Sequence, residues 1–452
     1  MAFLVLGANS VSGYTVKNSL RFNSGSSDYL NRTPSTTTNQ KTWTMSFWMK
    51  PATTGVWYGI YGAWGASTAS DITKIEVYSD NTLNFIDYQS GALTAYLYTT
   101  QVFRDLSAWY HIVVAVDTTQ ATASNRIKIY VNGSQVTSFG TATYPTQNLD
   151  MNINSSSFTN RLGLTYNTGG TSAYYMSGYL SEYYSIDGQQ LDATSFGQTD
   201  TDTGIWIPKS YGGSYGTNGF YLKFANSSSL GTDSSGNGNN FTVNNLTSVD
   251  QTTDTPTNNF CTWNPLYYYG NQTITEGNLK LATGTSGASV GTIAVNTGKW
   301  YWEQKCISIN AESRIMGISK LVAGESLYDT AVYYKSDGQK IINNTNSSYG
   351  ATLANNDIVG LAIDVGSRSV TFYKNGTSQG SIDISSVYSS GDYIIPALPQ
   401  SGGASQTVDV NFGAGTTYSA NGYTDGAGYG NFSYSVPSGY YSLCTRNLAN
   451  FG

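Results

Sequence analysis

Residues 109–133 read WYHIVVAVDTTQATASNRIKIYVNG, and residues 357–376 read DIVGLAIDVGSRSVTFYKNG. Each stretch is an apolar run that ends in Asp, then a polar turn, then a second alternating run that ends in Asn-Gly. Alternation of β-branched and polar residues, bounded by turn residues, is typical of paired antiparallel strands. The Asn-Gly pairs supply the positive φ angles that a tight turn needs. Two such hairpins, far apart in the chain, predict two β-sandwich domains of related design.

The alternation also predicts which side chains are buried between the sheets. Those expected to point inward are Ile112, Val114, Val116, Ile127, Ile129 and Val131 in the first hairpin and Val359, Leu361, Ile363, Val370 and Phe372 in the second. Arg126, Lys128 and Tyr130 fall on the outer face of the first hairpin. An error of one residue in register would exchange the two faces.

The composition favours an all-β protein. The chain has 452 residues, enough for two or three domains of about 100–200 residues each. Charged residues make up 11%, while tyrosine and glycine number 37 and 49, as expected for many short strands joined by turns. Aromatic residues at 14% offer enough apolar surface to argue against disorder.

Charge and cysteine usage exclude several classes of partner and cofactor. The net charge is −6 and no basic run exists, so we expect no nucleic-acid partner. Cys261, Cys306 and Cys444 are odd in number and none forms a close pair. We therefore expect buried free thiols rather than a zinc site or a disulfide framework.

The first residues, MAFLVLGANS, form a short apolar lead. They lack the positive segment of a signal peptide, and no segment reaches the length of about 20 apolar residues that a membrane helix needs. We expect a protein made in a cytoplasm without a secretion signal and without membrane insertion. Residues 1–13 would be ordered by another chain, the alternative being that they add a strand to the protein's own first sandwich.

The order of motifs in the first half resembles the laminin-G-like, concanavalin-A-like jelly roll. The matching pieces are LRF…SDYL, TMSFWMKP, WYHIVVAVD…RIKIYVNG and GYLSEYYSIDGQQLDATSFG, between residues 20 and 197. The resemblance implies two antiparallel sheets packed face to face.

The last third resembles the SPRY domain, another concanavalin-A-like sandwich. The pieces that carry the resemblance are GKWYWEQKCI, the hairpin at residues 357–376 and the triplet Asn411-Phe412-Gly413. Between the two halves, DSSGNGNNFT and DTPTNNF are rich in loop-forming residues. The expected organisation is a lead at 1–13, a laminin-G-like domain at 14–225, a loop-rich connector at 226–270 and a SPRY-like domain at 271–452. This combination resembles virion proteins of marine tailed bacteriophages.

The residues that catalysis would need are sparse. His111 is the single histidine and lies within an expected strand, where a histidine packed at the sheet surface is the ordinary outcome. Glycosidases of this fold need two carboxyl groups close together, which Glu-X-Asp-X-X-Glu on one strand can supply. The sequence lacks that motif, and Glu76 with Asp80 or Glu182 with Asp187 have the wrong spacing. We therefore expect no enzyme.

Calcium and exposed aromatic rings are the remaining candidates for binding. Asp28, Asp187 and Asp233 are candidate calcium ligands by type, although Asp in TDSSG is more often a turn residue that bonds its own backbone. Rings of Tyr and Trp suit sugars and protein interfaces alike, and the alternative is that most of them belong to the core. The candidate ligand-binding residues are Trp57, Tyr58, Tyr61, Trp64, Tyr174, Tyr175 and Tyr183.

These observations predict a non-enzymatic virion surface protein that recognises host glycan, as a tail-associated, fibre-like or capsid-decorating component. Its partners would be other virion proteins, copies of itself and the host glycan. The competing interpretation is a structural component that joins neighbouring virion proteins without a ligand, and a polysaccharide hydrolase comes third.

Overall fold

The computed structural model describes residues 13–65, 70–167, 170, 172–267, 269–320, 327, 330–400 and 405–452. Strands account for 46% of the chain and helices for 5%, which confirms the all-β prediction. No helix in the described part is long and apolar enough to cross a membrane. The expectation for the lead at 1–13 falls almost wholly outside the described residues.

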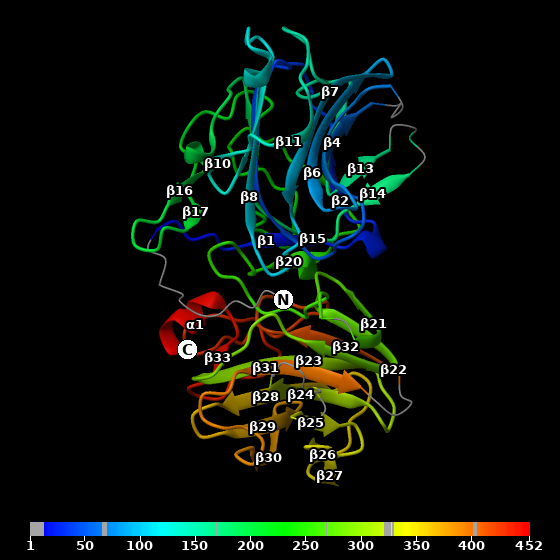
Figure 1. Ribbon diagram of the computed structural model, residues 1–452, viewed down its shortest axis with the longest axis vertical. Helices are drawn as coiled ribbons and strands as arrows, with labels where there is room; N and C mark the ends of the chain where they lie inside the picture. The colour runs from blue at the N-terminus through cyan, green and yellow to red at the C-terminus, as the bar shows by residue number, and fades with distance from the viewer. Residues whose placement is uncertain are drawn as a thin grey trace. The chain divides into compact units, whose positions relative to one another are not determined.

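Two compact units divide the chain, the first containing residues 13–251 and 255–257 and the second containing residues 252–254 and 258–452. The first unit is built on two eight-stranded sheets that lie face to face (Figure 1). The first sheet runs in the order β10 (Ser134–Gln135), β9 (Ile127–Val131), β8 (Tyr110–Asp117), β3 (Thr42–Pro51), β15 (Gly178–Asp187), β1 (Ser19–Phe22) and β20 (Gln251–Thr252), with β18 (Phe220–Leu222) paired to β15. The second runs in the order β11 (Phe139–Thr143), β7 (Ala92–Val102), β6 (Thr82–Gln89), β5 (Ile72–Val77), β4 (Tyr58–Trp64), β12 (Thr159–Leu162), β2 (Tyr29–Arg32) and β19 (Thr242–Asn244).

Short elements complete this unit. Two small hairpins pair β13 (Leu164–Tyr166) with β14 (Ala173–Tyr175) and β16 (Gly197–Thr199) with β17 (Trp206–Pro208). Single 3₁₀ turns occur at η1 (Ser24–Ser26), η2 (Ala123–Asn125), η3 (Ala193–Ser195) and η4 (Ser248–Asp250).

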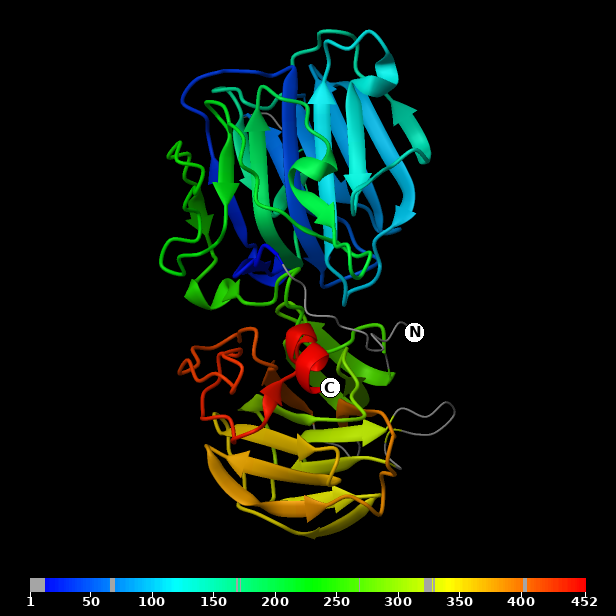
Figure 2. The same ribbon diagram turned by 90° about the vertical axis from the view of Figure 1, so that its left-hand side faces the viewer.

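The first predicted hairpin is formed by β8 and β9 in the expected register. Val114 lies opposite Ile129, and both are fully buried between the sheets. Asn132 and Gly133 have φ angles of 46° and 84°, as the Asn-Gly turn requires. On its other side β8 pairs with β3, seen in Figure 2 as a cyan strand beside a blue one.

The second unit contains a continuous thirteen-stranded sheet. Its order is β27 (Thr345–Ser348), β26 (Gln339–Ile342), β25 (Val332–Lys335), β24 (Arg314–Lys320), β31 (Ile394–Gln400), β22 (Lys280–Val290), β32 (Gln406–Asn411), β23 (Lys299–Ser308), β28 (Ile358–Asp364), β29 (Ser369–Lys374) and β30 (Thr377–Asp383). Off this path, β21 (Tyr269–Thr275) pairs with β22 and β33 (Tyr441–Ser442) pairs with β23, and the chain ends in α1 (Thr445–Phe451). The sheet folds over so that its two end strands approach each other. There the hydroxyl of Tyr349, the residue that follows β27, donates to the Gly380 carbonyl of β30.

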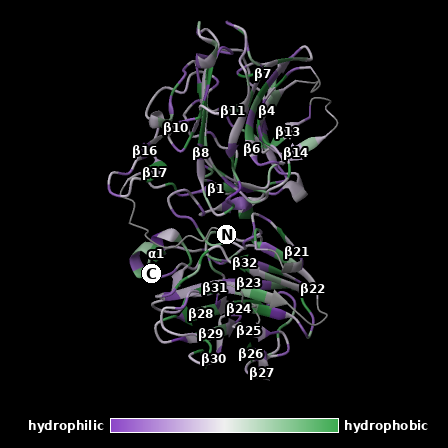
Figure 3. Ribbon diagram, viewed as in Figure 1, coloured by the Kyte–Doolittle hydropathy of each residue, from purple (hydrophilic) through white to green (hydrophobic). Residues whose placement is uncertain are grey.

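The second predicted hairpin, β28 and β29, is likewise confirmed. Leu361 lies opposite Phe372, and both are fully buried. The rings of Tyr334 and Phe372 lie 5.5 Å apart in the core of the unit. Figure 3 shows apolar residues (green) on strands of both units.

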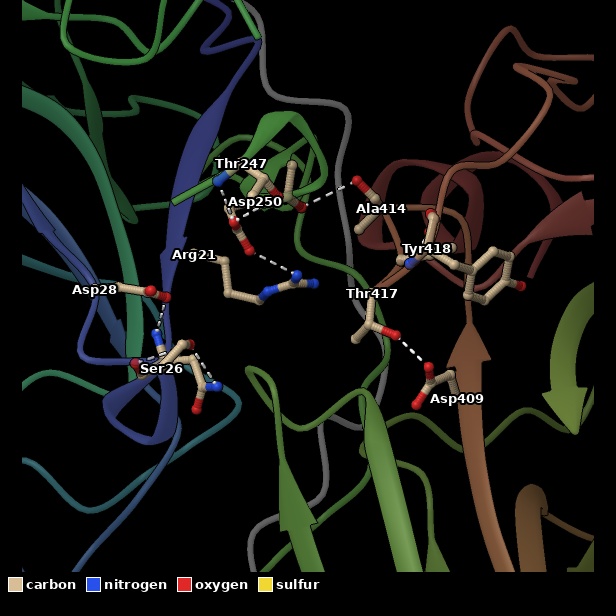
Figure 4. A network of polar contacts seen from close by, with 12 residues as sticks. Arg21, Ser26, Asp28, Thr247, Asp250, Asp409, Ala414, Thr417 and Tyr418 are labelled. Atoms are coloured by element: carbon tan, nitrogen blue, oxygen red, sulfur yellow. Dashed lines mark hydrogen bonds and ion pairs between the residues drawn. The ribbon is translucent and has the colours of Figure 1, made fainter. Parts of the chain in front are cut away.

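Residues 226–270, expected as a loop-rich connector, are divided between the two units, which meet in the sequence at residues 251–258. Phe241 joins the core of the first unit, where β19 pairs with β2. Arg21 of β1 forms a buried ion pair with Asp250 at 2.8 Å, and Asp250 also accepts from the Thr247 backbone N–H (Figure 4). Residues 258–270 belong to the second unit, where Phe260 and Trp263 are buried. Each of these apolar side chains is thus buried in the unit to which it belongs.

We predict that Phe372→Ala lowers the free energy of unfolding by about 3–5 kcal/mol, because it deletes a fully buried ring and leaves a cavity. Urea unfolding of the full chain measures the change. Leu266→Ala is the matched control, since Leu266 is 53% exposed and its truncation should change stability by less than about 0.5 kcal/mol. Equal effects from both variants would contradict the assigned register.

Candidate functional site

Four of the seven aromatic candidates are buried, and the prediction that they face solvent is wrong. Tyr58, Tyr61, Trp64 and Tyr183 are at most 3% exposed. A β-bulge in β4, between Gly59 and Tyr61, breaks the alternation, so that Ile60 and Tyr61 both enter the core. Such a bulge adds one residue to a strand and redirects the side chains beyond it. The alternative weighed from sequence, that these rings belong to the core, is correct for them.

Trp64 is buried for a different reason. It points to the outer side of its sheet and is covered by β13 and β14, while the guanidinium of Arg161 lies 3.8 Å from its ring. Tyr175, another candidate, is half-buried in the same cluster and lies 6.3 Å from Tyr29.

Trp57 and Tyr174 do lie at the surface, and they form part of a larger group. The indole of Trp57 is 40% exposed, stacks on Tyr78 at 4.1 Å and lies 5.3 Å from Tyr174. Its Nε1–H donates to the Ser79 hydroxyl at 3.0 Å, which fixes the orientation of the ring.

The group continues onto β7 through rings that the sequence analysis did not single out. Tyr98 lies 6.0 Å from Tyr78 and 6.1 Å from Tyr96. The spacing of Tyr96 and Tyr98, two residues apart in an alternating strand, is the signal that could have identified them. We call Trp57, Tyr78, Tyr96, Tyr98 and Tyr174 the aromatic face. All five rings are half-buried or exposed.

The carboxylate of Asp80 borders the aromatic face. It accepts a hydrogen bond from the Tyr98 hydroxyl, and this bond raises the pKa of Tyr98. Asp80 also accepts from the Thr82 hydroxyl at 2.6 Å. The aromatic face therefore offers flat apolar rings, hydroxyl groups and one fixed carboxylate.

A buried ion pair supports the sheet beneath the aromatic face. Lys74 Nζ lies 2.7 Å from Glu76 Oε1, with both side chains at most 3% exposed. Lys74 also donates to the Tyr166 carbonyl, and Thr165 donates to Glu76, so the pair holds β13 against β5. Burial raises the pKa of Glu76, and the nearby Lys74 opposes the shift. Gly59 permits this contact, since a Cβ there would lie 2.3 Å from the Thr165 nitrogen.

The three calcium candidates do not converge. Among the described residues no group of three His, Cys, Asp or Glu side chains could hold a metal ion. Asp28 Oδ2 accepts from the Asn23 backbone N–H at 2.9 Å (Figure 4).

Asp187 accepts hydrogen bonds from Thr38, Asn39, Asn154 and Asn218. Asp233 accepts from the Ser235 and Asn239 N–H groups, which is the turn role weighed from sequence.

The carboxylate of Glu182 is surrounded by tyrosine hydroxyls. Tyr14, Tyr184 and Tyr221 all donate to it, at 2.9, 2.7 and 2.7 Å. Its backbone φ of 49° belongs to a bulge in β15, a conformation that costs energy outside glycine. Burial raises the pKa of Glu182. Glu182 and Asp187 are thus both occupied by protein donors.

His111 packs on the outer face of the first sheet, as expected. Trp206 Nε1–H donates to His111 Nδ1 at 2.9 Å, so the ring proton lies on Nε2 and is donated to the Ser46 hydroxyl at 2.8 Å. With its proton pointing at Ser46, the imidazole cannot accept a proton from that hydroxyl. The pair is therefore not a nucleophile with its base.

We predict that His111 makes stability depend on pH. Burial lowers its pKa from 6.5 to about 3, so between these values the unfolded chain binds a proton that the folded chain does not. The contribution of the neutral His111 side chain to the free energy of unfolding is complete above about pH 6.5. It is lost as the pH falls towards about 3, by about 1.4 kcal/mol per pH unit. Urea unfolding between about pH 4 and 7 should give His111→Gln a shallower slope than the parent chain. Equal slopes would contradict the assignment.

Comparisons with known proteins agree with this fold. Residues 24–184 match the laminin-G model of the concanavalin A-like lectin/glucanases superfamily, and residues 299–415 match the SPRY domain model. No curated protein matches the chain.

Two solved structures illustrate the likeness. The SPRY domain of human HERC1 is 16% identical over 33% of this chain and 96% of its own, with a TM-score of 0.29. The heptameric SAP-like pentraxin of Limulus polyphemus is 19% identical over 40% of this chain and 80% of its own, also with a TM-score of 0.29. From the two family matches, the chain contains a concanavalin A-like, laminin-G-type domain followed by a SPRY domain.

Proposed function

We propose that this protein is a non-enzymatic recognition protein whose aromatic face binds glycan on a host surface. The observation that carries the proposal is Trp57, a tryptophan held in one orientation by Tyr78 and Ser79 and yet 40% exposed. Fixed aromatic rings with polar tips suit sugar rings, because they contact apolar C–H groups while their hydroxyls bond the sugar hydroxyls.

The charge of the aromatic face narrows the class of glycan. The charged group that borders this face is the carboxylate of Asp80, which already accepts hydrogen bonds from Tyr98 and Thr82. A neutral glycan fits this surface better than a polyanionic one, which would need arginine or lysine partners.

We further propose that the protein acts on the surface of a tailed-phage virion, next to other virion proteins or copies of itself. The support is that a laminin-G-like domain followed by a SPRY-like domain resembles virion proteins of marine tailed bacteriophages. Detection of the chain on purified particles by antibody labelling tests this location, and its absence from particles that infect normally would contradict it.

A structural role without a ligand is the second candidate. Val56, next to Trp57, is 46% exposed, and two consecutive exposed apolar residues also suit a protein interface. A neighbouring virion protein would then cover the loop.

We predict that Trp57→Ala weakens binding to host-cell glycan by about 2 kcal/mol, or about thirtyfold in Kd, as for a central aromatic residue of an interface. Binding of the full chain to immobilised host polysaccharide measures the effect. Tyr423→Ala is the control, since Tyr423 is 45% exposed in the other unit. Unchanged glycan binding, together with poorer incorporation into particles, would favour the structural role.

We also predict that the chain releases no reducing sugar from host polysaccharide. Glu76 is paired with Lys74, and Glu182 accepts from three tyrosines, so neither carboxyl group is free to act as acid or nucleophile. Reducing-sugar release that one Asp→Asn or Glu→Gln substitution abolishes would overturn the proposal.

A further inference from the structure

The rings of the aromatic face form a row that crosses several strands of the second sheet. Trp57 precedes β4, Tyr78 follows β5, and the other end of the row lies on β7, beyond β6. The ring of Tyr78 lies 4.1 Å from that of Trp57 and 6.0 Å from that of Tyr98. Tyr98 in turn lies 6.1 Å from Tyr96. Each ring therefore lies next to the following one, and the row has no gap.

The end of the row at Trp57 is held in place by the protein itself. Tyr78 stacks on one side of the indole, with an angle of 15° between the rings, and the Ser79 hydroxyl accepts from Nε1–H. The loop that carries Trp57 is held as well, because the Gly55 backbone N–H donates to Asn81 Oδ1 at 3.0 Å. The exposed part of the indole thus has a fixed position before any ligand binds.

The end at Tyr98 is held in place by different residues. Its hydroxyl donates to Asp80, whose carboxylate is oriented by the Thr82 hydroxyl. The ring also lies directly against the backbone of β11, since a Cβ added at Gly140 would come within 2.7 Å of Tyr98 Cδ1. A ring that is already fixed loses little conformational entropy on binding. Both ends of the row are therefore prepared for contact with a ligand.

The rings are tilted relative to one another, which limits the shape of the ligand. The planes of Tyr78 and Tyr98 meet at 53°, and those of Tyr96 and Tyr98 meet at 58°. One flat surface cannot lie against rings tilted to this degree. A single chain whose successive sugars can rotate about their linkages can follow them, whereas the face of a crystalline polysaccharide cannot.

We propose that the aromatic face is an extended site, in which Trp57, Tyr78, Tyr98 and Tyr96 contact about three consecutive sugar rings of one soluble glycan chain. The inference rests on the proposed function and names the form of glycan that the site takes. A single terminal sugar would contact one end of the row and leave the other fixed end unused. Tyr98 is then a specificity-determining residue, because it contacts only those glycans that extend beyond Trp57.

Competition for the immobilised host polysaccharide tests the extended site. The probes are soluble fragments of that polysaccharide, separated by size from the monosaccharide to the hexasaccharide. With the full chain, the affinity should rise by at least about tenfold from the monosaccharide to the tetrasaccharide, as additional sugars contact additional rings. It should change little beyond that length, where the row ends.

Variants at the far end of the row connect this length dependence to the rings. Tyr98→Ala should weaken tetrasaccharide binding by about five- to tenfold and leave disaccharide binding at Trp57 unchanged. Tyr98→Phe keeps the ring and should restore tetrasaccharide binding to within about twofold. Tyr393→Ala is the matched control, since Tyr393 is 39% exposed in the other unit, and it should bind every fragment normally. Equal melting temperatures of the four chains would show that folding is unaffected.

The possible failures separate the two proposals. If the polysaccharide itself does not bind, the proposed function is overturned and the extended site with it. If the polysaccharide binds but the monosaccharide competes as well as the hexasaccharide, only the extended site is overturned. The same conclusion follows if Tyr98→Ala leaves the length dependence unchanged, or if the chain prefers crystalline cellulose or chitin to the soluble fragments.

Discussion

Both sandwiches depend on an asparagine that fixes the register of three strands at once. In the first unit Asn132 Oδ1 accepts from the His111 N–H at 2.8 Å, while the Asn132 N–H donates to the His111 carbonyl at 2.9 Å. In the second, Asn375 bonds Ile358 in the same two ways, each at 2.8 Å. The Asn-Gly turn that follows the second strand of each set, β9 or β29, therefore also binds the first strand, β8 or β28. A slip of one residue would break both bonds and turn the core face to solvent.

Period-two alternation was sufficient to predict this part of the fold from sequence. The inward faces of β8, β9, β28 and β29 follow directly from it, because these strands are regular over the residues that matter. The same reasoning fails at β4, where a bulge sends Ile60 and Tyr61 to one side. A bulge leaves little trace in a single sequence, since the residues around it remain ordinary strand formers.

The candidate site was predicted only in part for the same reason. Trp57 lies just before β4 and was found, whereas its stacking partner Tyr78 follows β5 and was not singled out. Their contact depends on the pairing of the two strands across the bulge. The division of residues 226–270 between the two units could not be predicted, because contacts such as that between Arg21 and Asp250 join residues far apart in the chain. Composition alone shows only that residues 226–270 are rich in turns.

Because the chain has few charged residues, some of its buried carboxylates accept hydrogen bonds from neutral groups instead of pairing with a cation. Asp187 is surrounded by hydroxyl, amide and backbone donors, and Asp425 in the second unit accepts from Ser442, Tyr429 and Asn447 in a similar way. A buried carboxylate with several neutral donors is stabilised without a cation. The abundant Ser, Thr, Asn and Tyr thus supply the internal donors that lysine and arginine would otherwise provide.

That use of the carboxylates limits which groups are free to meet a ligand. A carboxylate whose oxygens already accept several protein hydrogen bonds can bind a metal or transfer a proton only if those bonds are broken, at a cost of about 1–3 kcal/mol for each buried group left unpaired. The exposed face of the Trp57 ring carries no such commitment. Recognition through uncharged groups is therefore the mode that this network of internal hydrogen bonds favours, as in the aromatic face.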